Sequence, residues 1–222
     1  MAAAISAHLE QNPSHILASL DGKNAFNTWS RDRMWDTLLE SFPSIATLVK
    51  VLYGDPSSIL FHEPGSGLTE ILNSVGCKQG CSLGSFLFCL AIHPLLLQLQ
   101  AEFPELLIIG YCDDINIVGK PDRVIEAYGR WAHLYGSLLQ GQLRSDKCKV
   151  YSPSLANSAS LLHSLGLPLD TKVNHAGLRV LGAPVGSTSF MASFAAETVA
   201  AITDDLDALG HMPCWKARDL LG

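Results

Sequence analysis

The stretch LLIIGYCDDINIVG, at positions 106–119, decides the fold of this chain. Two apolar runs, 106–112 and 115–119, are separated only by Asp113 and Asp114. Short apolar runs that flank a two-residue break are typical of a tight β-hairpin. The sequence therefore predicts two antiparallel strands with both carboxylates at the tip of their hairpin.

A third acidic residue follows another short apolar segment. We expect residues 15–20 to form a strand that emerges from an N-terminal helix, and Asp21 ends it. Adjacent aspartates repel each other, but they are useful beside Mg²⁺, which prefers a few carboxylates together with substrate phosphates. Two such ions can activate an attacking oxygen and stabilise a leaving one in phosphoryl transfer. Aspartate is also an ordinary turn residue, so the Asp113–Asp114 pair by itself leaves both interpretations open.

Helical spacing and strand-like runs fill the rest of the sequence. We expect helices over 31–42 (ended by Pro43), 45–53, 85–100, 121–139 and 190–209. We expect further strands over 147–151 and 178–182, a turn-rich region over 54–67, and a glycine-punctuated loop over 76–84. This mixture predicts the α+β class, with a small antiparallel sheet backed by helices.

Composition excludes several classes of protein. With 48% hydrophobic and 16% charged residues among 222, the chain is not intrinsically disordered. The apolar run 83–97 is interrupted by Ser85, His93 and Pro94 and is too short to cross a bilayer, which favours a buried helix and no membrane. The amino end lacks the basic-then-apolar order of a secretory signal, so we expect a soluble intracellular protein, in nucleus or cytoplasm.

The spacing of the six cysteines matches no zinc site and favours reduced thiols.

Five blocks, in order along residues 20–186, resemble the palm of a reverse transcriptase (an RNA-directed DNA polymerase) of the non-LTR retrotransposon type. They are DGKNAFN (21–27) with Arg31 for motif A, GCKQG (76–80) running on through 83–84 to 87–88 for motif B, YCDD (111–114) for motif C, 143–148 for motif D and LGAPVG (181–186) for motif E. Five blocks in the right order are far more specific than any single one, and they cover about three quarters of the chain.

The resemblance implies a catalytic centre that holds two Mg²⁺ ions, with Mn²⁺ as the alternative metal. Asp21 and Asp113 would ligate both ions, and Asp114 would belong to the same metal site and assist it. Lys147 would give a proton to the departing pyrophosphate. Lys147 taken alone fits an exposed lysine at a strand edge equally well.

The resemblance also implies a nucleotide site. Phe26 would occupy the place of a ribonucleotide's 2′-hydroxyl and so favour dNTPs, because a flat ring excludes that hydroxyl sterically. Gln79 and Gly80 would support the incoming nucleotide and the template, and Tyr111 would complete the substrate-binding residues. The partners implied are an RNA template, a DNA primer and dNTPs.

The implied organisation is a palm over 1–187, with a fingers-side insertion at about 43–75, followed by the beginning of a helical thumb or connection over 188–222. The family's basic fingers strands would stand upstream of motif A, and we find none there. Their absence makes the net charge of −6 easier to reconcile with nucleic-acid binding. Three positions depart from the motifs of many relatives, namely Asn27, Cys81 and Arg144, and none of them removes a metal ligand.

Two alternatives remain open from the sequence. GCSLG (80–84) matches the nucleophile elbow of α/β-hydrolases, with Ser82 as nucleophile and Asp113 plus a downstream histidine (133, 163 or 175) as partners. The polar, glycine-broken segment 73–79 before it does not resemble the buried strand that an elbow needs. The other alternative is a catalytically inactive retroelement relic without fingers, against which the intact aspartate trio argues.

Overall fold

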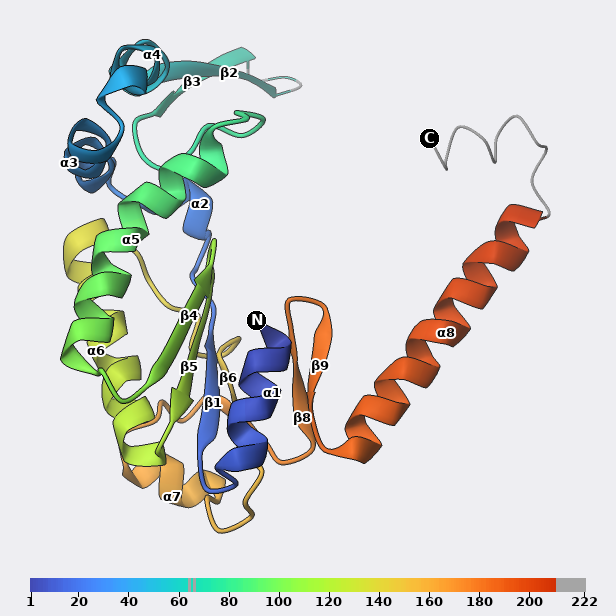
Figure 1. Cartoon of the computed structure of the whole chain (residues 1–222). Coiled ribbons are helices and arrows are strands. Elements are labelled where there is room, and N and C mark those ends of the chain that lie inside the picture. The colour runs from blue at the N-terminus through green and yellow to red at the C-terminus, as the bar shows by residue number, and fades with distance from the viewer. Residues whose placement is uncertain (64, 66, 211–222) are drawn as a thin grey trace.

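A five-stranded sheet forms the centre of the molecule (Figure 1). The computed structural model describes residues 1–63, 65 and 67–210. In spatial order the strands are β4 (Leu107–Tyr111), β5 (Asp114–Gly119), β1 (Ile16–Leu20), β6 (Lys149–Tyr151) and β7 (Lys172–Asn174). All neighbours are antiparallel except β6 and β7, which pair in parallel. The predicted α+β class with a small sheet is confirmed, with one parallel pair added at its edge.

Helices cover one face of this sheet (Figure 1). The apolar residues of β1 alternate between its two faces, as the twofold period of a strand requires. Ile16, Ala18 and Leu20 join the core formed with α5 (Gly84–Glu102) and α6 (Pro121–Leu139). Since the strand contributes to cores on both sides, every residue of β1 except Ser19 is buried.

The opposite face carries a second, smaller core. Leu17 of β1 and Val118 of β5 pack there against α1 (Ala2–Gln11) and the hairpin of β8 (Gly177–Val180) and β9 (Ala183–Gly186). Sequence reasoning predicted a single strand over 178–182. The chain instead turns at Leu181 and Gly182, whose φ angles of 48° and 83° suit a two-residue hairpin turn.

Helix α5 is long and apolar enough to cross a membrane by length and composition alone. Its side chains show a different role, because Leu87, Phe88, Ala91 and Leu95 are buried in the main core. It packs beside α6 and the sheet (Figure 1). The helix is therefore a core element of the fold, as the sequence predicted.

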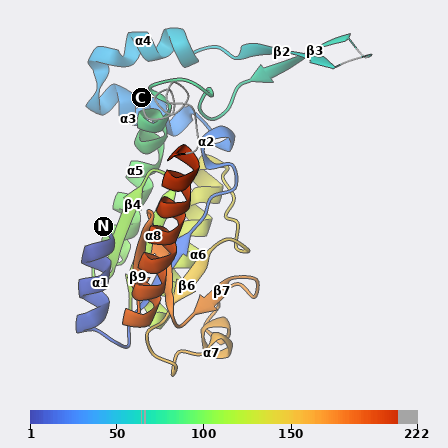
Figure 2. The ribbon, with the colours of Figure 1, turned by 90° about the vertical axis from the view of Figure 1, so that its right-hand side faces the viewer.

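A second cluster of elements lies beyond one end of the sheet (Figure 1). It consists of α2 (Ala25–Thr28), α3 (Asp32–Ser41), α4 (Pro43–Tyr53), β2 (Ser57–Glu63) and β3 (Gly67–Asn73). Strands β2 and β3 form an antiparallel hairpin that projects from the body (Figure 2). The predicted turn-rich region over 54–67 is therefore wrong, because the alternation in SSILFHE outweighs the glycines and prolines around it.

Two short elements and a final long helix complete the chain. The helix α7 (Ala159–Ser164) and the strand β7 were not predicted, since segments of three to six residues carry too few side chains for a periodic signal. The last helix, α8 (Thr188–Gly210), contains the predicted 190–209 and stands away from the sheet (Figure 1).

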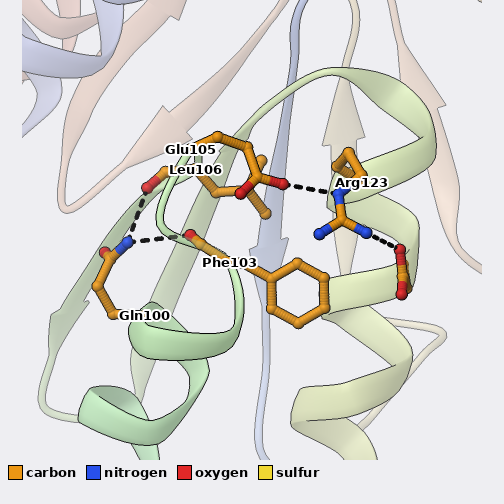
Figure 3. Close-up of polar contacts among 6 residues, drawn as sticks. Gln100, Phe103, Glu105, Leu106 and Arg123 are labelled. Atoms are coloured by element: carbon orange, nitrogen blue, oxygen red, sulfur yellow. Dashed lines mark hydrogen bonds and ion pairs between the residues drawn. The ribbon is translucent and has the colours of Figure 1, made fainter.

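The loop from α5 to β4 is fastened at both of its ends (Figure 3). Gln100 donates two hydrogen bonds of 3.1 Å, from Nε2 to the carbonyls of Phe103 and Leu106. Arg123, in the first turn of α6, pairs with Glu105 at 2.6 Å and lies 4.8 Å from the centre of the Phe103 ring. These contacts fix the start of β4, the strand that leads to Tyr111.

Candidate active site

The three predicted acidic residues lie at the same end of the sheet. Leu20 pairs with Ile115 across β1 and β5, so Asp21 follows β1 at the level where β5 begins. Asp114 is the first residue of β5 and pairs with Tyr111. The two-residue turn is therefore Cys112–Asp113, with Cys112 at φ 52°, and not the predicted Asp113–Asp114. The buried side chains of Ile115 and Val118 fix this register.

Negative charge accumulates at this end of the sheet, where the charge of Arg144 acts on Asp21 although Arg144 forms its ion pair with Asp146. Burial raises the pKa of the Asp114 carboxyl above its ordinary value, and the charges of Asp113 and Asp21 raise it further. Among the ion pairs of the described residues, none includes any of these three carboxylates. Nor do three ligand-type side chains anywhere in that part of the chain lie close enough together to hold a metal ion. The carboxylates nevertheless fit a hard cation, which prefers oxygen ligands and would relieve their repulsion.

The backbone of Asp21 is held by a segment far along the chain. Its carbonyl accepts a hydrogen bond of 2.8 Å from the Arg144 N–H, and its own N–H donates to the Cys148 thiol at 3.3 Å. Gly22 forms a β-bridge with Leu143. The segment that resembles motif D therefore fixes the position of the first metal-ligand candidate. Lys147 lies on the exposed turn of this segment.

Motifs A and B are joined through the short helix α2. The ring of Phe26 is half-buried, with its centre 4.7 Å from that of Phe88 on α5. The Phe26 carbonyl accepts a hydrogen bond of 2.6 Å from the Cys77 N–H, and the Trp29 carbonyl accepts one of 2.8 Å from Gly76. Movement of the motif B loop would therefore move Phe26 as well.

An open pocket gathers the predicted nucleotide-site residues. Phe26, Gln79 and Gly80 line it together with Asn27, Lys78 and Ser85, and its volume is about 410 Å³. Gln79 and Gly80 are exposed on the loop before α5. Tyr111 lies elsewhere, on β4 beside the acidic turn, with 61% of its surface exposed. The structure thus brings three of the four predicted substrate residues together and places the fourth next to the carboxylates.

Arg31 has a structural role that sequence reasoning did not assign. Its guanidinium is buried and donates hydrogen bonds to the carbonyls of Gly76 and Val75 and to Asn73, at 2.7–3.1 Å. It also stacks over the Tyr53 ring, 4.9 Å from its centre. Burial lowers the pKa of this guanidinium below its ordinary value. The sequence signal was its place beside the block that resembles motif A, and this does not reveal partners some 45 residues away.

Tyr135 is a second residue that the sequence did not single out. Its side chain is 3% exposed, and the residue lines the same small cavity as Asp113. On the sequence, Tyr135 belongs to the apolar stripe of α6 and is indistinguishable from the packing residues around it.

The structure excludes the hydrolase alternative. A nucleophile elbow needs a strand directly before its serine, whereas β3 ends at Asn73 and Ser82 lies exposed in a turn. Two of the candidate histidine partners have other contacts. The Nδ1 atoms of His163 and His175 form hydrogen bonds with the backbone carbonyls of Leu167 and Ser152.

The cysteines were predicted to be reduced thiols. The five in the described part of the chain are free, and Cys214 lies outside that part.

Known proteins are similar to this chain in sequence. The family profile described as reverse transcriptase (RNA-dependent DNA polymerase) matches residues 3–185. The retrotransposable element SLACS 132 kDa protein of Trypanosoma brucei gambiense is 31% identical over 110 residues, which make up 49% of this chain and 9% of that protein. The chain therefore spans less than a tenth of the length of this curated relative.

Two solved structures are similar in fold. Telomerase from Candida albicans, in complex with a TWJ fragment of telomeric RNA, has a TM-score of 0.61 at 12% identity, and the match covers 85% of this chain and 33% of that one. Apo telomerase from Candida tropicalis, truncated from its C-terminal domain, has a TM-score of 0.51 at 12% identity, with 66% and 34% covered. At this level of identity the likeness shows a common fold alone.

Proposed function

Because the chain belongs to the reverse transcriptase (RNA-dependent DNA polymerase) family, we propose that it is the palm of an RNA-directed DNA polymerase of a non-LTR retroelement. In the reaction proposed, a primer 3′-hydroxyl attacks the α-phosphate of a dNTP and pyrophosphate leaves. The observation that carries this proposal is the position of Asp21, Asp113 and Asp114 at the same end of adjacent strands, where none of them takes part in an ion pair of the described residues.

Each acidic residue has a proposed role. Asp21 and Asp113 would hold two Mg²⁺ ions, or Mn²⁺ in their place, and Asp114 would assist from the first position of β5. Bound there, the ions would lower the charge on the reacting phosphate and activate the attacking oxygen. The protein's own contribution is to hold the carboxylates in place, which the hydrogen bonds of Arg144 and Cys148 to the Asp21 backbone support.

The pocket beside Phe26 is the proposed dNTP site. The Phe88 contact holds the Phe26 ring, which would exclude a 2′-hydroxyl, and Gln79 and Gly80 would support the nucleotide and template. Gly80 has a φ of 80° and open space around it, so its backbone can approach a ligand closely. Tyr111 would contact substrate next to the carboxylates. Lys147 would protonate the pyrophosphate.

The proposed organisation keeps residues 1–187 as palm, with the fingers-side insertion at about 43–75, and residues 188–222 as the start of a thumb or connection. The outward direction of α8 supports this division within the described residues. The proposed partners are an RNA template and a DNA primer. With a net charge of −6, the palm itself would contribute little to their affinity, so most phosphate contacts would come from other basic regions of a polymerase.

Asp113→Asn tests the proposed function in a protein that carries this palm together with fingers. The substitution keeps the shape of the turn and removes one ligand charge, so we expect primer extension on an RNA template to be abolished. Asp36→Asn is the matched control, because Asp36 lies exposed on α3 and pairs only loosely, at 4.0 Å, with Arg33. Extension that survives in Asp113→Asn would refute the assignment, and an inactive wild type would favour the relic.

A further inference from the structure

Gln79 and Gly80 occupy the centre of a tight turn before α5. The Cys81 N–H donates a hydrogen bond of 3.1 Å to the Lys78 carbonyl, which closes a four-residue turn with Gln79 and Gly80 in its two central positions. Gly80 has a φ of 80°, the value that the third residue of a type II turn adopts and that glycine favours. The orientation of these two proposed nucleotide-site residues therefore depends on what holds the ends of the turn.

The side chain of Tyr53, the last residue of α4, reaches both ends of this turn. Its hydroxyl accepts a hydrogen bond of 3.1 Å from the Lys78 N–H. Burial raises the pKa of this hydroxyl to about 12, and the Cys81 thiol beside it contributes to the rise. The hydroxyl therefore keeps its proton at physiological pH, and it accepts from the first residue of the turn while it lies next to the last.

The ring of Tyr53 is fixed by its own contacts. Its side chain is 2% exposed, and the Arg31 guanidinium and the Lys78 ammonium lie 4.9 Å and 5.4 Å from the ring centre. Both distances suit attraction between a cation and an aromatic face. Arg31 in turn donates hydrogen bonds to the carbonyls of Val75 and Gly76, in the segment that leads to the turn. The hydroxyl is therefore a fixed point against which the turn is held.

We propose that Tyr53 is a positioning residue whose hydroxyl holds the turn at 78–81 in place and so orients Gln79 and Gly80 toward the incoming dNTP. This inference rests on the proposed function, in which the pocket beside Phe26 takes the dNTP. All four residues of the turn line that pocket, whereas Tyr53 is buried, so its hydroxyl acts on a bound nucleotide through the turn. A preorganised site loses less conformational freedom when its ligand binds, so a loosened turn would weaken dNTP binding.

Tyr53→Phe tests this inference in a polymerase that carries this palm together with fingers. The substitution keeps the ring and its contacts with the two cations and removes only the hydroxyl. Steady-state primer extension on an RNA template measures kcat and the KM values for dNTP and for primer–template. We expect the KM for dNTP to rise about fivefold, as for the loss of one hydrogen bond, while kcat and the KM for primer–template stay unchanged. Tyr151→Phe is the matched control, because Tyr151 is similarly buried but belongs to the core on the opposite face of the sheet.

The outcomes separate this inference from the proposed function. If the wild type extends primers and Tyr53→Phe has the same KM for dNTP, the inference is overturned and the proposed function stands. If Tyr53→Phe changes kcat and both KM values together, or Tyr151→Phe raises the KM for dNTP equally, the hydroxyl has only a structural role and the inference is overturned as well. If the wild type extends no primer, or Asp113→Asn extends primers as well as the wild type, the proposed function itself fails and this inference fails with it.

Discussion

Gly76 links the two loops of the site through a backbone conformation that other residues resist. Its φ is 60°, and a Cβ there would lie 2.4 Å from the carbonyl carbon of Asn27. This close approach allows the Gly76 N–H to donate to Trp29 and its carbonyl to accept from Arg31. The connection between motifs A and B therefore depends on the absence of a side chain at this one position.

We predict that Gly76→Ala lowers the free energy of unfolding by about 3 kcal/mol, the sum of left-handed strain and a backbone clash. Denaturation in urea measures the loss. Gly80→Ala is the control, because Gly80 has a φ of 80° but nothing within 4 Å of its Cβ position. Strain alone should cost Gly80→Ala about 1 kcal/mol. Equal losses in the two variants would mean that the contact with Asn27 does not matter.

Some residues of the site could be predicted from the sequence, and others could not. Asp21, Asp113 and Asp114 stand out because carboxylates after apolar strands have a recognisable chemistry, and the structure places them at one end of the sheet. Arg31 stands beside the block that resembles motif A, but its structural role comes from partners that only folding brings close. Tyr135 does not stand out, because a tyrosine on an apolar helix stripe is common.

At the scale of elements, the loop between α5 and β4 sets the position of the acidic hairpin. Gln100 caps this loop with its two hydrogen bonds to the carbonyls of Phe103 and Leu106 (Figure 3). Its partners are backbone groups close to the buried side chains of Phe103 and Leu106. Removal of the amide would leave these carbonyls with one partner fewer at the point where β4 begins.

Gln100→Ala should therefore lower the free energy of unfolding by about 1–2 kcal/mol, as expected for two hydrogen bonds lost next to the core. Thermal or urea unfolding measures this change. Gln98→Ala serves as control, since Gln98 lies exposed on the same helix and bonds only to the Glu102 side chain at 2.9 Å. If both variants unfold alike, the capping of the loop contributes nothing to stability.

Long elements with a clear period could be predicted, and short ones could not. The helix α6 spans Pro121–Leu139 as its amphipathic pattern indicates, since nineteen residues repeat that pattern many times. The hairpin β2–β3 was not predicted, because the glycines and prolines around its strands indicated turns instead. Strand β7, with only three residues, exists because it pairs with β6, and no property of KVN by itself specifies that pairing.

At the scale of the whole molecule, α8 contributes little to the packed body beyond its first two turns. Phe190 packs against Gly177 and Gly186 of the β8–β9 hairpin, and Arg179 lies 5.6 Å from the centre of the Phe194 ring. Apolar residues farther along, among them Val199, Ile202 and Leu206, are exposed. The helix therefore has its anchor at its beginning.

We predict that a chain ending after Ala196 keeps the free energy of unfolding of a chain ending after Gly210 within about 0.5 kcal/mol, because positions 197–208 are exposed and exposed positions rarely contribute more. A chain ending after Ser187 is the comparison. It loses the Phe190 and Phe194 contacts and should be less stable by about 2 kcal/mol or more. Urea denaturation distinguishes the two. A large loss in the longer truncation would place the stabilising contacts of α8 in its outer turns instead.

The central place of β1 has a consequence for how the protein is made. Both of its neighbours, β5 and β6, come later in the chain, and the Asp21 N–H meets its Cys148 partner across 127 residues. While the ribosome works, β1 is an apolar strand with two open edges, the kind of segment that chaperones bind and that aggregates when left unpaired. The backbone of Asp21 cannot gain its contacts with Arg144 and Cys148 until those residues have left the exit tunnel. A product cut short before that point would keep one edge of β1 unpaired and prone to aggregation, and its first acidic residue would lack this support.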